Sequence, residues 1–253
     1  MNHGKACAPA RSPACPPSRS RAGLIRPESI HPALWRASSF HTPQQATVST
    51  GFAQLDRELP GQGWPVGSLT ELAYDQPGIG EVNLLRPAMN QLTERHIVLV
   101  HPPGEPCIHC CVNWQIDWRR LLLIAPRSAD DALWAAEQIL RHDSRAILLC
   151  WASLVPAAAL RRLHLAARDG GSLFFLLRPA STLRQPSIAP LRLRLRPTAQ
   201  GLALSIAKRQ GPTCNTPVSI PLYPHSRGID HVSLDLPGLP HPRSGRPHSR
   251  LAK

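Results

Sequence analysis

The stretch from 63 to 87 constrains the fold of this chain most, because it predicts a strand, a glycine loop and a helix in that order. It reads GWPVGSLTELAYDQPGIGEVNLLRP. A short apolar run over 69–73 precedes the loop 75–80. Such a loop between a strand and a helix forms a cradle of backbone N–H groups for phosphate. The helix is predicted from apolar residues with helical spacing, which are Val82, Leu85, Met89 and Leu92.

The residues after the last glycine lack the chemistry of a nucleotide site. A working P-loop carries a lysine that neutralises the β- and γ-phosphates, followed by a hydroxyl that binds magnesium. Here Gly80 is followed by Glu81 and Val82. A carboxylate repels a triphosphate, and valine offers a metal no ligand. We therefore predict that Gly78, Gly80, Glu81 and Val82 form a degenerate P-loop and that the protein uses no cofactor.

Two families resemble parts of this chain. The segment 49–72 resembles the entry of the RecA/RadA recombinase core, and HPALWR (31–36), STGFAQLD (49–56), GQGWPVGSLTEL (61–72) and PGIGE with LLRPA (77–88) resemble a bacterial relative of that core. The closer resemblance is to ImuA, the RecA-like accessory protein of bacterial translesion mutagenesis. An overlapping resemblance is to the cell-division inhibitor SulA, through Cys150-Trp151-Ala152 and the segment 167–181. Together the two resemblances cover roughly residues 31–223.

The resemblance implies an α/β fold, with a RecA-like P-loop core whose mostly parallel central sheet is flanked by helices. Ser128 is the predicted N-cap of a helix that begins with two aspartates, and 157–169 is predicted to be helical. Strict alternation over 191–196 and a turn at 200–201 predict an antiparallel hairpin at the C-terminal end of the sheet. Continuous apolar runs predict the remaining strands at 97–100, 121–124, 146–149 and 173–177.

Composition divides the chain into three parts. Residues 1–30 form a predicted disordered arm rich in proline and arginine, 31–223 the RecA-like domain, and 224–253 a disordered basic tail. HPALWR, at the start of the predicted domain, is a candidate docking helix, and Val232–Leu236 in the tail is a candidate docking peptide. Each is as readily explained as an unstructured arm or a meaningless apolar island.

Three further positions argue against catalysis. In RecA-like ATPases a glutamate at the end of the second strand activates water, but the run 97–100 ends in His101, and Glu105 comes only after two prolines. The Walker B aspartate that would hold magnesium is replaced by Cys150. The polar sensor at the next strand end is replaced by Leu177 and Arg178. We therefore predict that the protein is not an enzyme.

Basic residues predict a surface for nucleic acid or an acidic partner. From Gly170 to Gly228 the chain has no acidic residue. A charged, exposed strand face is also a common way to stay soluble and avoid edge pairing, but we favour partner or DNA contact. The candidate residues are Arg178, Arg184, Arg192, Arg194, Arg196, Lys208 and Arg209.

Charge and cysteine content set broad limits. The 253 residues carry a net charge of +13, with 29 Lys and Arg against 16 Asp and Glu. Much of this excess lies near the two ends, which weakens the case for a dedicated nucleic-acid face. Seven cysteines favour a reducing compartment. Cys107 and Cys110 form a C-x-x-C pair near His101 and His109, but without a second such pair we predict no metal site.

The sequence therefore favours a non-catalytic accessory protein of SOS-induced, error-prone translesion DNA synthesis. The resemblance to ImuA implies three partners, namely RecA, an ImuB-like Y-family polymerase homologue and an error-prone replicative-type polymerase. The alternative is a SulA-like inhibitor that binds the division-ring GTPase. No apolar run approaches the roughly 20 residues of a membrane span, and no secretory signal is predicted. We expect a cytoplasmic protein that associates with the nucleoid when engaged.

Overall fold

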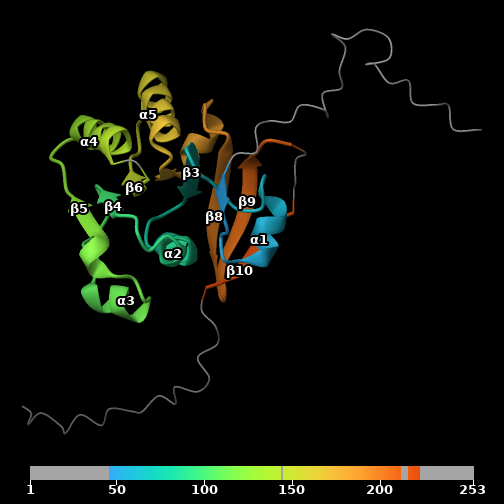
Figure 1. Ribbon diagram of the computed structural model, residues 1–253. Coiled ribbons are helices and arrows are strands. Elements are labelled where there is room, and N and C mark those ends of the chain that lie inside the picture. The colour runs from blue at the N-terminus through green and yellow to red at the C-terminus, as the bar shows by residue number, and fades with distance from the viewer. Residues whose placement is uncertain (1–45, 144, 212–215, 223–253) are drawn as a thin grey trace, which may run out of the picture. The chain divides into compact units, whose positions relative to one another are not determined.

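The computed structural model describes residues 46–143, 145–211 and 216–222. Figure 1 shows a central sheet with helices on both of its faces. The strands are β1 (Thr47–Val48), β2 (Trp64–Pro65), β3 (Ser68–Tyr74), β4 (Ile97–Val100), β5 (Leu121–Ile124), β6 (Ile147–Trp151), β7 (Leu173–Pro179), β8 (Leu191–Thr198), β9 (Gly201–Lys208) and β10 (Val218–Pro221). The helices are α1 (Ala53–Glu58), α2 (Glu81–Gln91), α3 (Ile108–Asn113), α4 (Ala129–His142) and α5 (Ala157–Gly170), with short 3₁₀ turns η3 (Trp118–Arg120) and η4 (Ala180–Arg184).

Eight strands form one mostly parallel sheet in the order β10-β9-β8-β3-β7-β6-β4-β5. The six strands from β8 to β5 run parallel to their neighbours, and β9 and β10 complete the sheet antiparallel. The predicted mixed α/β class and the hairpin of β8 and β9 are therefore confirmed. A separate pair of short strands, β1 and β2, is antiparallel.

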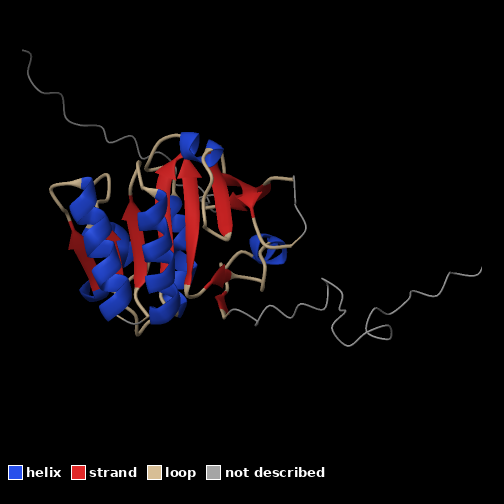
Figure 2. Ribbon diagram, turned by 90° about the horizontal axis from the view of Figure 1, so that it is seen from above, coloured by secondary structure: helices blue, strands red, loops and turns tan. Residues whose placement is uncertain are grey.

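The chain winds over both faces of this sheet. After β3 it crosses by α2 to β4 and β5, and it returns by α4 and α5 through β6 to β7, beside β3. Because crossovers of one hand put helices on opposite faces when the direction of travel reverses, α2 covers one face while α4 and α5 cover the other. Figures 1 and 2 show these layers. Two apolar cores result, one under α2 and one under α4 and α5.

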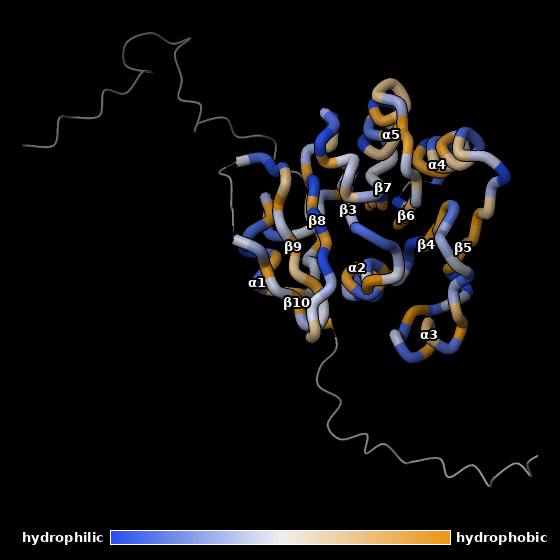
Figure 3. Tube along the Cα trace, turned by 180° about the vertical axis from the view of Figure 1, so that it is seen from behind, coloured by the Kyte–Doolittle hydropathy of each residue, from blue (hydrophilic) through white to orange (hydrophobic). Residues whose placement is uncertain are grey.

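Burial follows the position of each strand in the sheet. Every residue of β3, β4 and β6 is buried, as expected for central strands covered on both faces. The edge strand β5 has the same apolar composition, but Leu122 and Leu123 are 47% and 43% exposed. Figure 3 shows the apolar stretches of β4 and β5 side by side. The apolar pattern therefore predicted each strand but not its place in the sheet.

The helix ends agree with the predicted signals, and the buried face of α2 differs in detail. Ser128 caps α4 by accepting a hydrogen bond from the Asp131 N–H at 3.1 Å, as predicted. In α2, Leu85 and Met89 are buried as expected, whereas Val82 and Leu92 are only partly buried. Leu84 and Ala88 complete the buried face instead, because this face packs against both the sheet and the turn before α1.

The STGFAQLD motif builds a closed turn before α1. The Asp56 carboxylate accepts hydrogen bonds from the Ser49 hydroxyl at 2.7 Å and the Thr50 N–H at 2.9 Å. Gly51 lies at φ 81°, and a Cβ there would come within 2.3 Å of the Pro87 side chain on α2. The motif thus has a structural role, since it joins the start of the domain to α2.

Several predicted features lie outside the described residues. They are the arm 1–30, the HPALWR motif, the tail 224–253 and its apolar island. Among the residues that are described, no helix has the length and apolar character needed to cross a membrane.

Candidate functional site

The loop between β3 and α2 supplies its own anion. Gly78 and Gly80 lie at φ 83° and 112°, so their N–H groups point into the turn. The Glu81 carboxylate accepts a hydrogen bond from the Gly78 N–H at 2.8 Å and one from the Gly80 N–H at 3.1 Å. A carboxylate therefore fills the place that phosphate takes in a nucleotide cradle. Burial, followed by the charge of Glu81, raises the pKa of Tyr74 to about 12.

The residue at the predicted Walker B position is buried in the sheet. Cys150 on β6 pairs in register with Val100 on β4 and Leu176 on β7. Its side chain is fully buried, and burial raises the pKa of the thiol to about 12. A neutral, buried thiol offers magnesium no ligand. Absence of catalysis is still a prediction, and the geometry supplies physical reasons for it.

The predicted catalytic-glutamate position also has a different role. His101 lies at φ 52°, where β4 ends. Its N–H donates to the Ile124 carbonyl at 2.8 Å, and its Nδ1 lies 3.4 Å from the Trp151 carbonyl oxygen. His101 therefore links the ends of β4, β5 and β6 and turns the chain toward α3.

A largely apolar cavity of about 420 Å³ opens beside the glycine loop. It lies between α2, α3 and the strands β4 and β5, and its lining also includes the prolines and glycine of 102–106. The sequence alone did not predict it, because its walls come from segments far apart in the chain. Its main apolar lining residues are Met89, Ile97, Leu99, Trp114, Ile116 and Trp151.

Polar groups at this cavity are few. Glu81, Asn83 and Glu105 line it. Among the described atoms, neither Asn83 Oδ1 nor Trp151 Nε1 has a hydrogen-bond partner, although both are buried. Asn83 uses its Nδ2 to donate to the Leu222 carbonyl at 3.4 Å, which ties β10 to α2. The cavity can therefore take an apolar group.

The cysteines of the C-x-x-C pair lie on the rim of the same cavity. Cys107 and Cys110 are exposed, whereas Cys111 is buried. The backbone N–H and thiol of Cys110, followed by the backbone and imidazole of His109, lower the pKa of Cys107 to about 7. Within the described ranges, no group of three or more His, Cys, Asp or Glu side chains could hold a metal ion.

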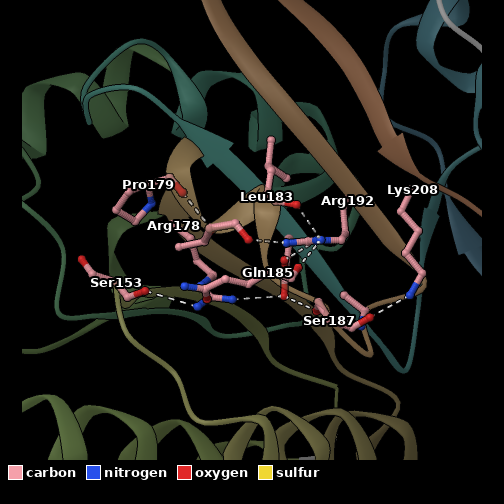
Figure 4. A network of polar contacts seen from close by, with 11 residues as sticks. Ser153, Arg178, Pro179, Leu183, Gln185, Ser187, Arg192 and Lys208 are labelled. Carbon is pink, nitrogen blue, oxygen red and sulfur yellow. Dashed lines mark hydrogen bonds and ion pairs between the residues drawn. The ribbon is translucent and has the colours of Figure 1, made fainter.

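A buried ionic cluster joins the centre of the sheet to the loop after β7. Glu71 on β3 is 1% exposed and contacts two arginines. Its Oε2 accepts from Arg192 Nε at 2.7 Å, and its Oε1 lies 3.5 Å from Arg178 Nη1. The Ser187 hydroxyl also donates to Oε1. Figure 4 shows Arg178, Arg192 and Ser187 brought together from β7, β8 and the connecting loop.

Backbone carbonyls satisfy most of the remaining guanidinium donors. Arg192 donates to the carbonyls of Thr182, Leu183 and Gln185, the shortest at 2.9 Å. Arg178 donates to the Ser153 carbonyl at 3.2 Å, whereas its Nε has no partner in the described chain. Burial lowers the pKa of Arg178, the charge of Glu71 opposes this shift, and Arg192 adds to it.

The prediction that Arg178 and Arg192 belong to a basic surface is therefore wrong. They are only 2% and 6% exposed, and both are ion-paired with Glu71. Alternation correctly indicated that Arg192 lies on the opposite face of β8 from its leucines. It did not reveal that the loop carrying η4 covers this face, because that contact depends on tertiary packing.

The other candidate cations are more accessible. Arg184, Arg196 and Lys208 are exposed, and Lys208 Nζ donates to the Ser187 carbonyl at 2.8 Å. Arg194 pairs with Asp75 at 3.1 Å and Arg209 with Glu58 at 3.2 Å, so part of their charge is neutralised. A role of these five residues in binding DNA or a partner stays a prediction.

The fold and the site thus define a mixed α/β protein with a large, mostly parallel sheet and a loop that carries its own carboxylate. No protein-family model matches the chain. The chain is 29% identical over 120 residues to the cell division inhibitor SulA of Edwardsiella piscicida, covering 45% of this chain and 68% of that protein. The crystal structure of SulA from Pseudomonas aeruginosa matches with a TM-score of 0.37 and 23% identity, over 44% of this chain and 97% of that one.

The sequence similarity to SulA agrees with the second resemblance noted in the sequence. It covers less than half of this chain. A TM-score of 0.37 does not by itself indicate a common fold. Neither match bears on the resemblance to ImuA, which stays a prediction.

Proposed function

We propose that this protein is a non-catalytic protein of the SOS response to DNA damage that inhibits cell division by binding the division-ring GTPase. The observation that carries the proposal is the 29% identity over 120 residues to a cell division inhibitor. SulA-like inhibition needs only a binding surface. It therefore suits a protein whose nucleotide loop holds a glutamate in place of phosphate.

We also propose that the domain is a RecA-like core whose nucleotide site has been lost. Two features support this. The glycine loop follows β3, and the chain comes back to lie beside β3 as β7 after crossing the other face of the sheet. Ligands of open α/β sheets bind where the direction of winding changes in this way. The loop also keeps its left-handed glycines, although the residues after them are Glu81 and Val82. In this proposal Glu81 replaces the nucleotide as the anion that stabilises the loop.

A partner surface on the C-terminal hairpin fits this function. Arg196 on β8 and Lys208 on β9 are exposed, and Arg184 is exposed on η4. Cations on one side of a docking surface increase the association rate with an acidic partner, and salt weakens this effect. The buried arginines cannot contribute, because Glu71 neutralises part of their charge inside the protein.

The direct test is assembly of the purified division-ring GTPase with GTP, measured by sedimentation with and without the full chain. We expect less polymer in proportion to added protein. The Arg196→Glu variant should inhibit less, whereas Arg161→Glu, a change at another exposed arginine on α5, should act like the wild type. Undiminished polymer at excess protein would overturn the proposal. Equal inhibition by both variants would remove only the basic surface from it.

Translesion synthesis is the second candidate function. It is favoured by the STGFAQLD turn, which Asp56 holds closed, and by the β8–β9 hairpin. STGFAQLD is one of the segments that resemble ImuA, and we expect a SulA-like domain to lack both this motif and the basic hairpin. The discriminating experiment immobilises the full chain and adds RecA or the Y-family-like polymerase homologue, with and without ATP. Retention of either protein without ATP, together with unaffected division-ring assembly, would reverse the order of the two functions.

A further inference from the structure

Cys107 and Cys110 are placed to act on each other. Cys107 immediately precedes α3, and Cys110 lies three residues further on, so the two side chains are neighbours on one helical turn. Both are exposed, and both line the apolar cavity beside the glycine loop. A small molecule that enters this cavity therefore meets two thiols on its rim.

The two thiols differ in acidity, as in a nucleophile and its resolving partner. Donor groups of Cys110 and His109 lower the pKa of Cys107 to about 7. The pKa of Cys110 is raised, first by its hydrogen bond to Cys107 and then by the charge of that residue. Cys107 is therefore the better thiolate near neutral pH, and a thiolate is the form that attacks disulfides.

The neighbouring groups do not compete for this role. Cys111 is buried, and burial raises the pKa of its thiol. The charged or titratable groups around the pair are Glu81 and Glu105 in the cavity lining and His109 between the two cysteines. None of these is a thiol that could form a disulfide with Cys107.

We propose that Cys107 and Cys110 form a thiol–disulfide exchange site that reacts with low-molecular-weight disulfides. The Cys107 thiolate attacks one sulfur of the disulfide, its S–S bond breaks, and one thiol leaves after taking up a proton. Cys110 then loses its proton and attacks Cys107 Sγ, which releases the second thiol. The two protein thiols are oxidised to one disulfide, while the small disulfide is reduced to two thiols, so that electrons and protons balance.

The product disulfide would close only four residues at the start of α3. The fold can accommodate this change, because the cross-link lies within one helical turn and joins no distant elements. It would fix the wall of the cavity that carries 107–110. The proposal is independent of the proposed function, because it concerns the chemistry of the cavity rim and not the target of the protein.

The test uses the reduced full chain, glutathione disulfide at pH 7, and alkylation with iodoacetamide followed by tryptic mass spectrometry. Cys107, Cys110 and Cys111 lie in one tryptic peptide, 96–119. The wild-type peptide should contain an internal disulfide and one alkylated cysteine. Cys110→Ser should instead retain glutathione on Cys107, because the resolving thiol is missing. In the absence of glutathione disulfide, iodoacetamide should modify Cys107 roughly five-fold faster than Cys110. The more acidic Cys107 is more fully ionised at pH 7, although its thiolate is the weaker nucleophile.

Two controls keep the result interpretable. Cys111→Ser should form the internal disulfide as the wild type does, and buried Cys150 should carry no glutathione in any variant, which reports that the fold is intact. A stable glutathione adduct on wild-type Cys107 would overturn the proposal. So would a Cys107→Ser variant in which Cys110 reacts as fast as Cys107 does in the wild type.

Discussion

Glu71 is the carboxylate between the two buried guanidinium groups of Arg178 and Arg192, and it compensates their charge. Removing one partner of a buried ion pair typically costs about 3–5 kcal/mol, because the remaining charge is left without compensation. We therefore expect Glu71→Gln to lower the free energy of unfolding by about 3 kcal/mol or more, measured by urea denaturation. Asp75→Asn is the matched control. It breaks the exposed pair with Arg194 and should cost about 1 kcal/mol or less. A loss of unfolding free energy in Glu71→Gln as small as that expected for Asp75→Asn would show that the buried ion pairs do not stabilise the fold.

Glu81 is expected to behave as a built-in anion. Glu81→Ala leaves two loop N–H groups without their acceptor, at a cost of about 1–3 kcal/mol. Sulfate should recover part of the lost stability in this variant and should affect the wild type much less, because only the variant has an empty cradle. Thermal unfolding in matched concentrations of sulfate and chloride measures the difference. An identical response of the two proteins to sulfate would contradict the role assigned to Glu81.

At the scale of elements, α5 docks on the start of β3 through a neutral histidine. His164 Nδ1 accepts the Leu69 N–H at 3.3 Å. Burial, and then the charge of Arg168, lowers the pKa of His164 below 6.5. The folded state thus favours the neutral ring. The resulting stability is fully present above about pH 6.5, the unfolded value, and is lost as the pH falls toward the folded value.

The His164→Asn variant tests this linkage, because an asparagine oxygen can replace Nδ1 as the acceptor without titrating near neutral pH. Between pH 7.5 and pH 5.5, wild-type stability should fall, and this fall should be smaller in the variant. His142→Asn, an exposed change on α4, is the control and should keep the wild-type slope. Urea denaturation across the pH series gives the comparison. A steeper fall in His164→Asn than in the wild type would contradict the assignment.

At the scale of the whole molecule, the fold should be insensitive to nucleotide. A ligand that binds the native state raises its stability in proportion to the logarithm of ligand concentration over the dissociation constant. The loop between β3 and α2 is already occupied by Glu81, and buried Cys150 offers no metal ligand. We therefore expect millimolar ATP with magnesium to leave the thermal midpoint unchanged. A saturable increase would show that the loop still accepts phosphate and would require a different role for Glu81.

Most strands and helices could be predicted from the sequence, because each depends on a pattern of neighbouring residues. The run Ile147–Leu149, the N-cap Ser128 and the alternation of β8 each specify a local conformation through apolar spacing, hydrogen bonding or turn chemistry. The glycine loop between β3 and α2 could be predicted for the same reason, since Gly78 and Gly80 closely follow an apolar strand.

The candidate site depends instead on contacts between distant segments. Glu71 meets Arg178 and Arg192 across more than 100 residues of chain, so no local pattern indicated that these arginines are buried. The cavity that joins Met89, Ile116 and Trp151 has the same origin.

Local pattern thus specifies strands, helices and turns, because each depends on neighbouring residues. Packing specifies which strand lies at the edge, which charges are neutralised inside, and where an apolar cavity meets two cysteines. The physical reason is that desolvation and ion pairing depend on what covers a side chain. For Arg192 that cover is the loop carrying η4, which the fold alone brings over β8.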